Sequence, residues 1–389
     1  MEPELIREIE ARQRRCREII SERGLDGLLV VGKGPERTGD LQYLANHVPL
    51  LPGHPRRYSF KGRGFSFLLL PLDQPPVLLV TTPFYEKEIV IKDIRFHNDL
   101  IHQTGSVLRE KGLGRGDLGI VGTDILPISL YEDLLRELPG VRFFASDDVV
   151  MNLRAVKSDY EIFLLRKGAE IADQVCRQVK EMLKPGVREV DVAASIMVGL
   201  KEQGVDRPFA TCQSGDRSKE PYDHLPYSEK IIEEGDMVHM EINGRYRNYM
   251  IDVCRSTVVG KSSPEQRRLL EITLRMLDEA IAQTRPGIKA EDLEAVTGQI
   301  ALQEGLGANH TAAYGGPGTY LGHAIGLGTD EPPCLAKGDK TLLKEGMVLT
   351  IEPGLYRTPH GGCRIEDEVL VTKEGSEVLN KDPRRWWET

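Results

Sequence analysis

The sequence lacks the features of a membrane protein, a secreted protein or a nucleic-acid-binding protein. No apolar run is long enough to span a bilayer, and the N-terminal stretch MEPELIREIEARQRRC alternates charges without the apolar core of a secretory signal. The net charge is -9 and the isoelectric point is near 5.6. No basic stripe with interleaved aromatic residues offsets that charge. We therefore expect a cytoplasmic protein with no membrane or nucleic-acid partner.

Cysteine is also scarce, and the chain has no CxxC pair. In a reducing compartment such scattered cysteines are expected to be free thiols. Cys254 and Cys363 lie in strand-like runs near candidate metal ligands, and we expect them to be small buried hydrophobic residues that face away from those ligands or into the core. The six cysteines are Cys16, Cys176, Cys212, Cys254, Cys334 and Cys363.

What the chain does have is enough length for two domains, each with its own core. Residues 4–23 have the pattern of an amphipathic helix, and apolar strand-like runs alternate with helical stretches after it. This alternation predicts an α/β layer domain. The sequence LRAVKSDYEI marks a boundary, so we expect domains at 1–153 and 154–389. The expected N-terminal strands are 27–32, 65–72, 75–82, 118–122 and 141–146.

The second half contains two similar segments. Ser158 with Glu161 forms a capping box that starts a helix, and Ser263–Pro264 with Gln266 starts another. Each helix stops at a Pro-Gly pair and is followed by a second helix, in LKPGVREVDVAA and in TRPGIKAEDLEAV. Each helix pair then leads to apolar strands that carry carboxylates. We interpret this as a duplicated α/β (α+β) unit whose two sheets meet. The strands are 237–243, 250–256, 347–352 and 363–371.

Four carboxylates on these strands and one imidazole in the Gly-flanked segment GHAIG form a hard, oxygen-rich ligand set. Such a set suits a pair of divalent ions better than a structural zinc site, which prefers thiolates. Antiparallel strands joined through a short turn can bring two carboxylates to one side. Buried carboxylates repel one another, and two bound cations would relieve that repulsion. The five candidate ligands are Glu241, Asp252, His323, Glu352 and Glu366.

The local patterns GDMVHMEING, IDVCRS, GHAIGLGTDEPP, TIEPGLY and CRIEDEVLV resemble those of the creatinase, prolidase and aminopeptidase P family. The resemblance implies a creatinase-like N-terminal domain followed by a pita-bread catalytic domain with an internal pseudo-two-fold duplication. It implies two divalent ions (manganese, cobalt, iron or zinc) on the five ligands, and a metal-bridging water whose proton Glu352 accepts. It also implies a homodimer in which an N-terminal loop closes the neighbouring subunit's site.

Two positions depart from the family pattern. Glu241 stands where the family has aspartate, so it either binds with a shifted geometry or leaves one metal site weak or empty. Asp330 stands at the family's second substrate-side histidine. An ionised carboxylate only accepts hydrogen bonds, so Asp330 would oppose a role in oxyanion stabilisation unless it is protonated. It could instead attract a cationic group of the substrate.

Other residues are candidates through the resemblance. His224, eleven residues before Gly235, would bind the substrate or its oxyanion. Arg364 would support the metal ligands or bind a substrate carboxylate; the alternative is a solvent-facing strand arginine. Arg255 would support the site from behind the ligands.

The remaining polar residues near these motifs are expected to play no direct part. We expect Asp367 and Glu368 to be surface charges, and His310 and His360 not to reach the site. Loop 40–58 either closes a neighbour's site or has no such role. Its candidate contacts are His47, His54, Arg56 and Arg57.

We expect a metal-dependent hydrolase that resembles Xaa-Pro dipeptidases and aminopeptidases and cleaves a small peptide or amide bond. The catalytic residues would be His224, Glu352 and Asp330, with His224 and Arg364 binding the substrate. One alternative is a creatinase-like C–N hydrolase or a lyase acting on a small metabolite, with a weak or absent metal site. Another is a binding protein without catalysis.

Overall fold

A computed structural model describes residues 2–34, 39–51, 54–57, 60–221, 228–314, 320–382 and 384–389. The chain divides into two compact units, Met1–Arg154 and Ala155–Thr389. Each has its own sheets and its own hydrophobic core. None of the helices in the described ranges is long and apolar enough to cross a membrane.

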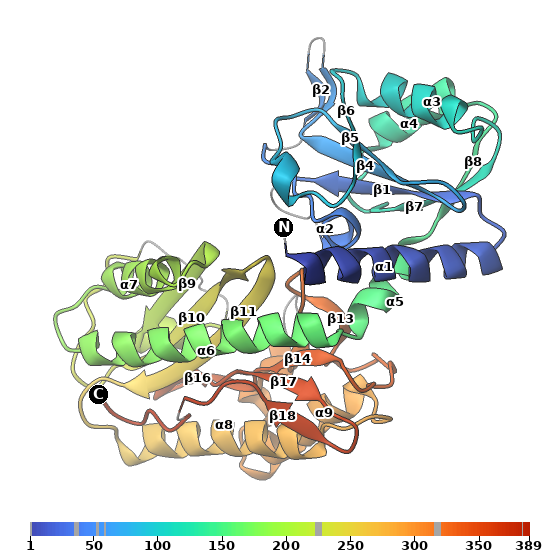
Figure 1. The fold of residues 1–389 in the computed structure, drawn as a ribbon. Helices are drawn as coiled ribbons and strands as arrows, with labels where there is room; N and C mark the ends of the chain where they lie inside the picture. Colours follow the sequence, from blue (N-terminus) through green and yellow to red (C-terminus); the bar gives the residue numbers. More distant parts are fainter. Residues whose placement is uncertain are drawn as a thin grey trace. The chain divides into compact units, whose positions relative to one another are not determined.

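The first unit is built on a six-stranded mixed sheet with the strand order β6-β5-β4-β1-β7-β8 (Figure 1). β1 runs antiparallel to β4 and parallel to β7. A separate two-stranded sheet pairs β2 with β3. The strands are β1 (Gly27–Lys33), β2 (His54–Arg57), β3 (Phe60–Arg63), β4 (Phe65–Pro71), β5 (Val77–Val80), β6 (Asp93–Phe96), β7 (Asp117–Val121) and β8 (Arg142–Ala145).

Residues that favour helix starts and stops mark the ends of helices in this unit. The first helix has Pro3 at its first turn, and Gly24 adopts a positive φ just after its end. Asp99 caps another helix by accepting hydrogen bonds from the Ile101 and His102 amides. The predicted helix 4–23 is confirmed as α1, and the five strands predicted for this unit are confirmed as β1, β4, β5, β7 and β8. The helices are α1 (Pro3–Glu22), α2 (Gly39–Ala45), η1 (Glu86–Glu88), α3 (Leu100–Glu110), α4 (Ile128–Glu137) and α5 (Asp147–Ala155).

Segment 40–58 was predicted to be a loop, and this is wrong for most of its length. It contains helix α2 and strand β2. His47 is buried in the unit, where its Nε2 lies 3.0 Å from the Ser66 hydroxyl, and burial lowers its pKa to about 4. Because it is a neutral core histidine, His47 is not a contact that this unit offers to another subunit. The side chains of His54, Arg56 and Arg57 lie outside the described residues.

In the second unit the order helix, helix, strands occurs twice, which is consistent with an internal duplication. Both predicted capping boxes are present, at Ser158 and at Ser263. After each long helix the Pro-Gly pair turns the chain, with Gly186 and Gly287 at positive φ. The helices are α6 (Asp159–Met182), α7 (Glu189–Glu202), η2 (Gly215–Lys219), α8 (Pro264–Gln283), α9 (Ala290–Gln303), η3 (Gly307–Asn309) and η4 (Thr311–Tyr314).

Two main sheets form the middle of this unit, with the orders β11-β10-β9 and β13-β12-β14-β17-β18, and β15 pairs with β16 beside them. In Figure 1, α6 and α8 flank the strands β16 and β17. The strands are β9 (Asp206–Ser214), β10 (Met237–Tyr246), β11 (Tyr249–Val258), β12 (His323–Ala324), β13 (Glu331–Cys334), β14 (Val348–Ile351), β15 (Gly354–Thr358), β16 (Gly361–Arg364), β17 (Asp367–Val371) and β18 (Ser376–Val378).

The packing of β10 fixes which of its side chains can line a site. Val238, Met240 and Ile242 belong to the core that β10 shares with α6 and α7. Because successive side chains of a strand point to opposite faces, His239 and Glu241 point away from these helices. Alternate packing therefore leaves one face of β10 free to carry polar groups.

We expect Ser158→Ala to lower the free energy of unfolding of the second unit by about 1 kcal/mol, because the helix start loses its capping hydrogen bond. Both tryptophans, Trp386 and Trp387, lie in this unit, so their fluorescence in a denaturant titration reports its unfolding alone. Ser195→Ala is the matched control, since Ser195 lies within α7 and caps nothing there. Equal midpoints for both variants would contradict the assigned cap.

Candidate metal centre

The first two candidate ligands lie on neighbouring antiparallel strands. In the register of β10 and β11, Glu241 is opposite Cys254 and Asn243 is opposite Asp252. Directly opposed residues share a face of the sheet, and so do residues two apart on one strand. Glu241 and Asp252 therefore point to the same side, and both side chains are buried.

The other three candidate ligands come from the second set of strands. His323 begins β12, Glu352 directly follows β14, and Glu366 lies between β16 and β17. The chain must pass very close to β14 just before His323, since a Cβ on Gly322 would lie 2.0 Å from the Thr350 carbonyl oxygen. Glycine at this position lets β12 approach β14 and brings the imidazole to the carboxylates.

The imidazole of His323 is oriented toward the acids. Its Nδ1 lies 3.1 Å from the Ala324 carbonyl oxygen, and its Nε2 lies 3.6 Å from both Asp252 Oδ2 and Glu352 Oε1. Ligand atoms of Asp252, His323 and Glu366 all lie within 4.8 Å of one another. When Nδ1–H donates a hydrogen bond to a backbone carbonyl, Nε2 keeps a lone pair, as in many metal-binding histidines.

The electrostatics of this cluster fit a bound cation. Burial raises the pKa of Asp252 and of Glu352 well above their usual values, and the charge of Glu366 raises both further. Burial also raises the pKa of Glu366, whose Oε2 has no hydrogen-bond partner among the described residues. Three hard oxygen ligands with one nitrogen are the donors that divalent ions such as manganese, iron, cobalt and zinc accept.

Arg364 is buried and not solvent-facing. It forms an ion pair with Glu241, and its Nη1 lies 3.2 Å from Glu352 Oε2. The guanidinium thus joins a ligand from the first pair of strands to a ligand from the second. It partly offsets the negative charge that gathers there.

Arg255 supports the backbone that carries the ligand Glu366. Its Nη2 lies 2.9 Å from Asp367 Oδ1, and both side chains are fully buried. Its Nη1 donates to the carbonyl oxygens of Cys254 and Glu366. These contacts tie β11 to the backbone of the Glu366 ligand.

The prediction that Asp367 and Glu368 are surface charges is wrong, since both are fully buried. They lie on β17, which is paired on both sides, by β14 and by β18, and an inner strand of a covered sheet has no exposed face. Asp367 pairs with Arg255, and Glu368 accepts a hydrogen bond of 2.9 Å from the Asp252 amide. Glu368 thus holds the backbone of Asp252, and Asp367 holds Arg255, which in turn binds the backbone of Glu366.

The prediction for Cys254 was half right. It is fully buried, but it lies on the ligand face of β11, because it is two residues from Asp252 and directly opposite Glu241. His239 was missed, although it is two residues from Glu241 on the same face. The sequence contained a signal for His239, because residues two apart on a strand point to the same face.

Asp330 lies at the edge of the cluster, with Oδ1 3.4 Å from His323 Nε2 and 60% of its side chain exposed. It has a positive φ and accepts a hydrogen bond from the Tyr320 hydroxyl. Burial and the Asp330 carboxylate both raise the pKa of Tyr320 above its usual value. Sequence reasoning missed Tyr320, because only the folded chain brings its hydroxyl to Asp330.

Among the described residues, the remaining histidine candidates do not join the cluster. His224 lies outside the described residues. His310 is buried against Thr297, at 3.1 Å, and burial lowers its pKa to about 4. His360 is exposed.

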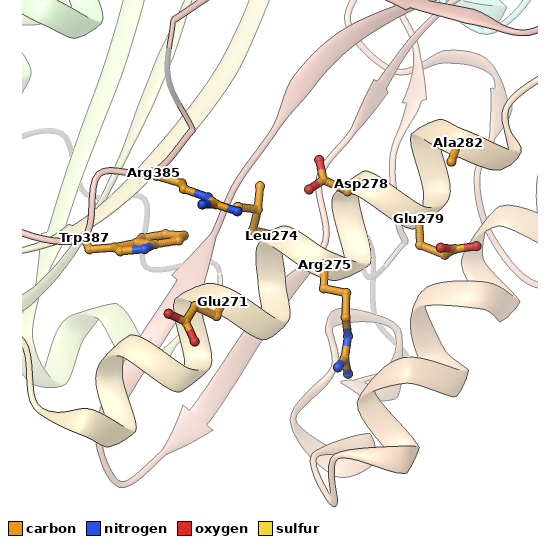
Figure 2. Close-up of a pocket in the computed structure, with 8 residues that line it drawn as sticks. All are labelled: Glu271, Leu274, Arg275, Asp278, Glu279, Ala282, Arg385 and Trp387. Carbon is orange, nitrogen blue, oxygen red and sulfur yellow. The ribbon is translucent and has the colours of Figure 1, made fainter.

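A hollow of about 610 Å³ on α8 contains none of the candidate residues (Figure 2). Its lining includes Glu271, Arg275, Asp278, Arg385 and Trp387.

Comparisons with known proteins support a metal-dependent enzyme. The model of metallopeptidase family M24 matches residues 164–373. The chain is 37% identical over 275 residues to a Xaa-Pro dipeptidase of Pyrococcus horikoshii, which covers 70% of this chain and 75% of the relative. A putative dipeptidase of Bacillus subtilis is 31% identical over 73% of this chain and 77% of its own.

Solved structures show the same fold. The prolidase from Pyrococcus horikoshii has a TM-score of 0.82 and 29% identity, with 97% of this chain and 99% of that chain covered. A Xaa-Pro dipeptidase from Bacillus anthracis has a TM-score of 0.84 and 27% identity, with coverage of 98% and 100%.

We expect Arg255→Met to destabilise the second unit by about 3 kcal/mol, because it removes one of the two cationic partners that the buried Asp367 carboxylate has among the described residues, Arg255 and Arg384. Tryptophan fluorescence in a denaturant titration measures this. Arg188→Met is the control, since Arg188 forms an exposed pair with Asp191, and its unfolding midpoint should stay close to that of the wild type. Similar losses for the two variants would show that Arg255 is not a structural tie.

Proposed function

Because the chain belongs to metallopeptidase family M24, we propose that it is a dipeptidase that cleaves the bond before proline in small peptides. The observation that carries this proposal is the convergence of Asp252, His323, Glu352 and Glu366, three of them buried acids with raised pKa values. The names of the relatives supply the substrate class.

The chain has the fold of the solved prolidases, the pita-bread architecture. We assign the unit Met1–Arg154 as the creatinase-like N-terminal domain and Ala155–Thr389 as the catalytic domain. We further infer a homodimer in the cytoplasm. Support for the location comes from the free state of all six cysteines, and support for the dimer comes from the family resemblance alone.

We assign five metal ligands, Glu241, Asp252, His323, Glu352 and Glu366, and two divalent ions, with manganese, cobalt, iron and zinc all compatible with the donors. Such ions, when bound, polarise a carbonyl and lower the pKa of a coordinated water toward neutrality. The chain's own task is to hold the ligand set. Arg255 and Glu368 fix the backbone of Glu366 and of Asp252.

Glu352 is the proposed proton acceptor. Burial raises its pKa, and the greater affinity for a proton suits a general base. Arg364 holds Glu352 and Glu241 in place, and these contacts favour support of the ligands over its other possible role in binding a substrate carboxylate. His224 is proposed to donate a hydrogen bond to the tetrahedral oxyanion, and this rests on the family resemblance at its spacing from Gly235.

Asp330 is proposed to receive the free amino group of the dipeptide. The carboxylate is the most exposed acid that contacts the cluster, and Tyr320 fixes its orientation. A carboxylate at this position attracts an ammonium group. The relatives found by comparison are peptidases, so the alternative of a metabolite hydrolase or lyase gains no support from them.

We expect removal of divalent ions by a chelator to abolish hydrolysis of Xaa-Pro dipeptides, and re-addition of manganese, cobalt or zinc to restore it. His323→Ala should lower kcat/KM by roughly 10³-fold, because the ions supply several kcal/mol of transition-state stabilisation. The measurement is proline release together with elemental analysis.

The control for this experiment is His102→Ala, since His102 is an exposed histidine of α3. It should hydrolyse at the wild-type rate. Hydrolysis that persists at full rate after complete metal removal would refute the proposed function.

We expect Asp330→Asn to raise KM for a free Xaa-Pro dipeptide by about tenfold, a loss of about 1.4 kcal/mol, because the ammonium group loses its ionic partner. The same variant should not change KM for a peptide whose amino terminus is acetylated. Asp216→Asn removes the same charge from an exposed position and is the control. Equal effects on free and acetylated peptides would contradict the assignment.

A further inference from the structure

A second group of possible metal ligands lies beside the acidic cluster, and its chemistry is different. It consists of His239, Glu241 and Cys254, whose ligand atoms all lie within 4.8 Å of one another. His239 and Cys254 are fully buried, and Glu241 is 5% exposed. We call this group the mixed cluster.

The strand geometry assembles the mixed cluster. His239 and Glu241 are two residues apart on β10, and Cys254 is directly opposite Glu241 on β11. All three therefore lie on the face that points away from α6 and α7. Because both strands are fixed by packing on their other face, the three side chains are held together without help from a loop.

Two buried polar atoms accompany the mixed cluster on the next strand. Thr211 and Gln213 of β9 are opposite Glu241 and His239, so they share the same face. Both residues are fully buried. Within the part of the chain that the structure describes, Thr211 Oγ1 and Gln213 Oε1 have no hydrogen-bond partner. Buried polar atoms are rarely left unsatisfied, so they indicate a further polar species at this face.

We propose that His239, Glu241 and Cys254 bind one metal ion of the zinc or cobalt class, so that the second ion of the centre has a mixed nitrogen, oxygen and sulfur ligand set. Imidazole, carboxylate and thiolate are the three ligand types of zinc sites, and three protein ligands leave a fourth position open. Thiolate disfavours manganese and magnesium, which prefer oxygen ligands.

This assignment deepens the proposed function, on which it rests for a second ion near Glu241. The first ion would be held by Asp252, His323 and Glu366, together with Glu352 beside His323, and so by one nitrogen and otherwise oxygen ligands. The two positions would then prefer different metals. The longer side chain of Glu241 would reach toward His239 and Cys254 instead of reproducing the shorter aspartate.

Two groups of the mixed cluster would be anionic when the ion is bound. On coordination the Cys254 thiol would release its proton to solvent, and its sulfur would give up a weak hydrogen bond to the Arg364 carbonyl oxygen, at 3.6 Å. The thiolate and the Glu241 carboxylate would together offset the charge of a divalent ion. Arg364 pairs with both Glu241 and Glu352, so Glu241 would contact the ion and Arg364 at once.

Cobalt substitution tests the site directly, because a thiolate ligand gives cobalt(II) a near-ultraviolet charge-transfer band that oxygen and nitrogen ligands do not give. We expect this band in the metal-free protein after titration with cobalt(II). Cys254→Ser should lose it, and His239→Ala should weaken cobalt binding at this site by about tenfold or more. Elemental analysis of zinc-loaded protein should show less zinc per chain in both variants.

Cys363→Ser is the matched control. Cys363 is also fully buried, but its sulfur contacts the Thr273 hydroxyl, at 3.2 Å, so the band should persist. If Cys254→Ser does not fold, Cys254→Ala replaces it and should likewise lose the band.

The outcomes separate this proposal from the peptidase assignment. Cobalt binding without a charge-transfer band, or a band that survives in Cys254→Ser, overturns the mixed cluster even if Xaa-Pro peptides are hydrolysed. A band that disappears in Cys254→Ser while no peptide is hydrolysed supports the mixed cluster and refutes the peptidase proposal.

Discussion

The mutual repulsion of buried acids is the constraint on which the rest of this structure depends. Asp252, Glu352 and Glu366 lie together out of water, and burial raises the pKa of each. A fold tolerates such a group only if cations share the space. Arg364 supplies part of that charge, and divalent ions of the metallopeptidase family would supply the rest. The chemistry of hydrolysis uses the same feature, since an ion that relieves the repulsion also activates water.

The scaffold around the acids is built to keep them close. Glu368 accepts the amide hydrogen of Asp252, and Arg255 binds the backbone carbonyl of Glu366 and the side chain of Asp367. These contacts join the first pair of strands to the second, so each sheet holds a ligand of the other in place. Catalytic geometry of this kind requires supporting residues that are themselves fixed by packing and hydrogen bonds.

The two residues that depart from the family pattern, Glu241 and Asp330, each lie beside a different part of the metal centre. Glu241 lies next to His239 and Cys254, and Asp330 lies next to His323 and Tyr320. In each case the altered side chain has neighbours that give it a chemical role, one toward the choice of metal and one toward the charge of the substrate. The departures therefore need not mean a lost activity.

The sequence by itself determined the helices with their caps at Ser158 and Ser263, the apolar strands and the order of the candidate ligands, because these depend on local spacing. It also contains the two-residue spacing that places Cys254 on the same face as Asp252. Tertiary structure alone decided that Asp367 and Glu368 are buried and that Arg364 pairs with Glu241. Burial and ion pairing depend on which strands become neighbours, and residues more than a hundred positions apart reveal their contacts only when the sheets have assembled.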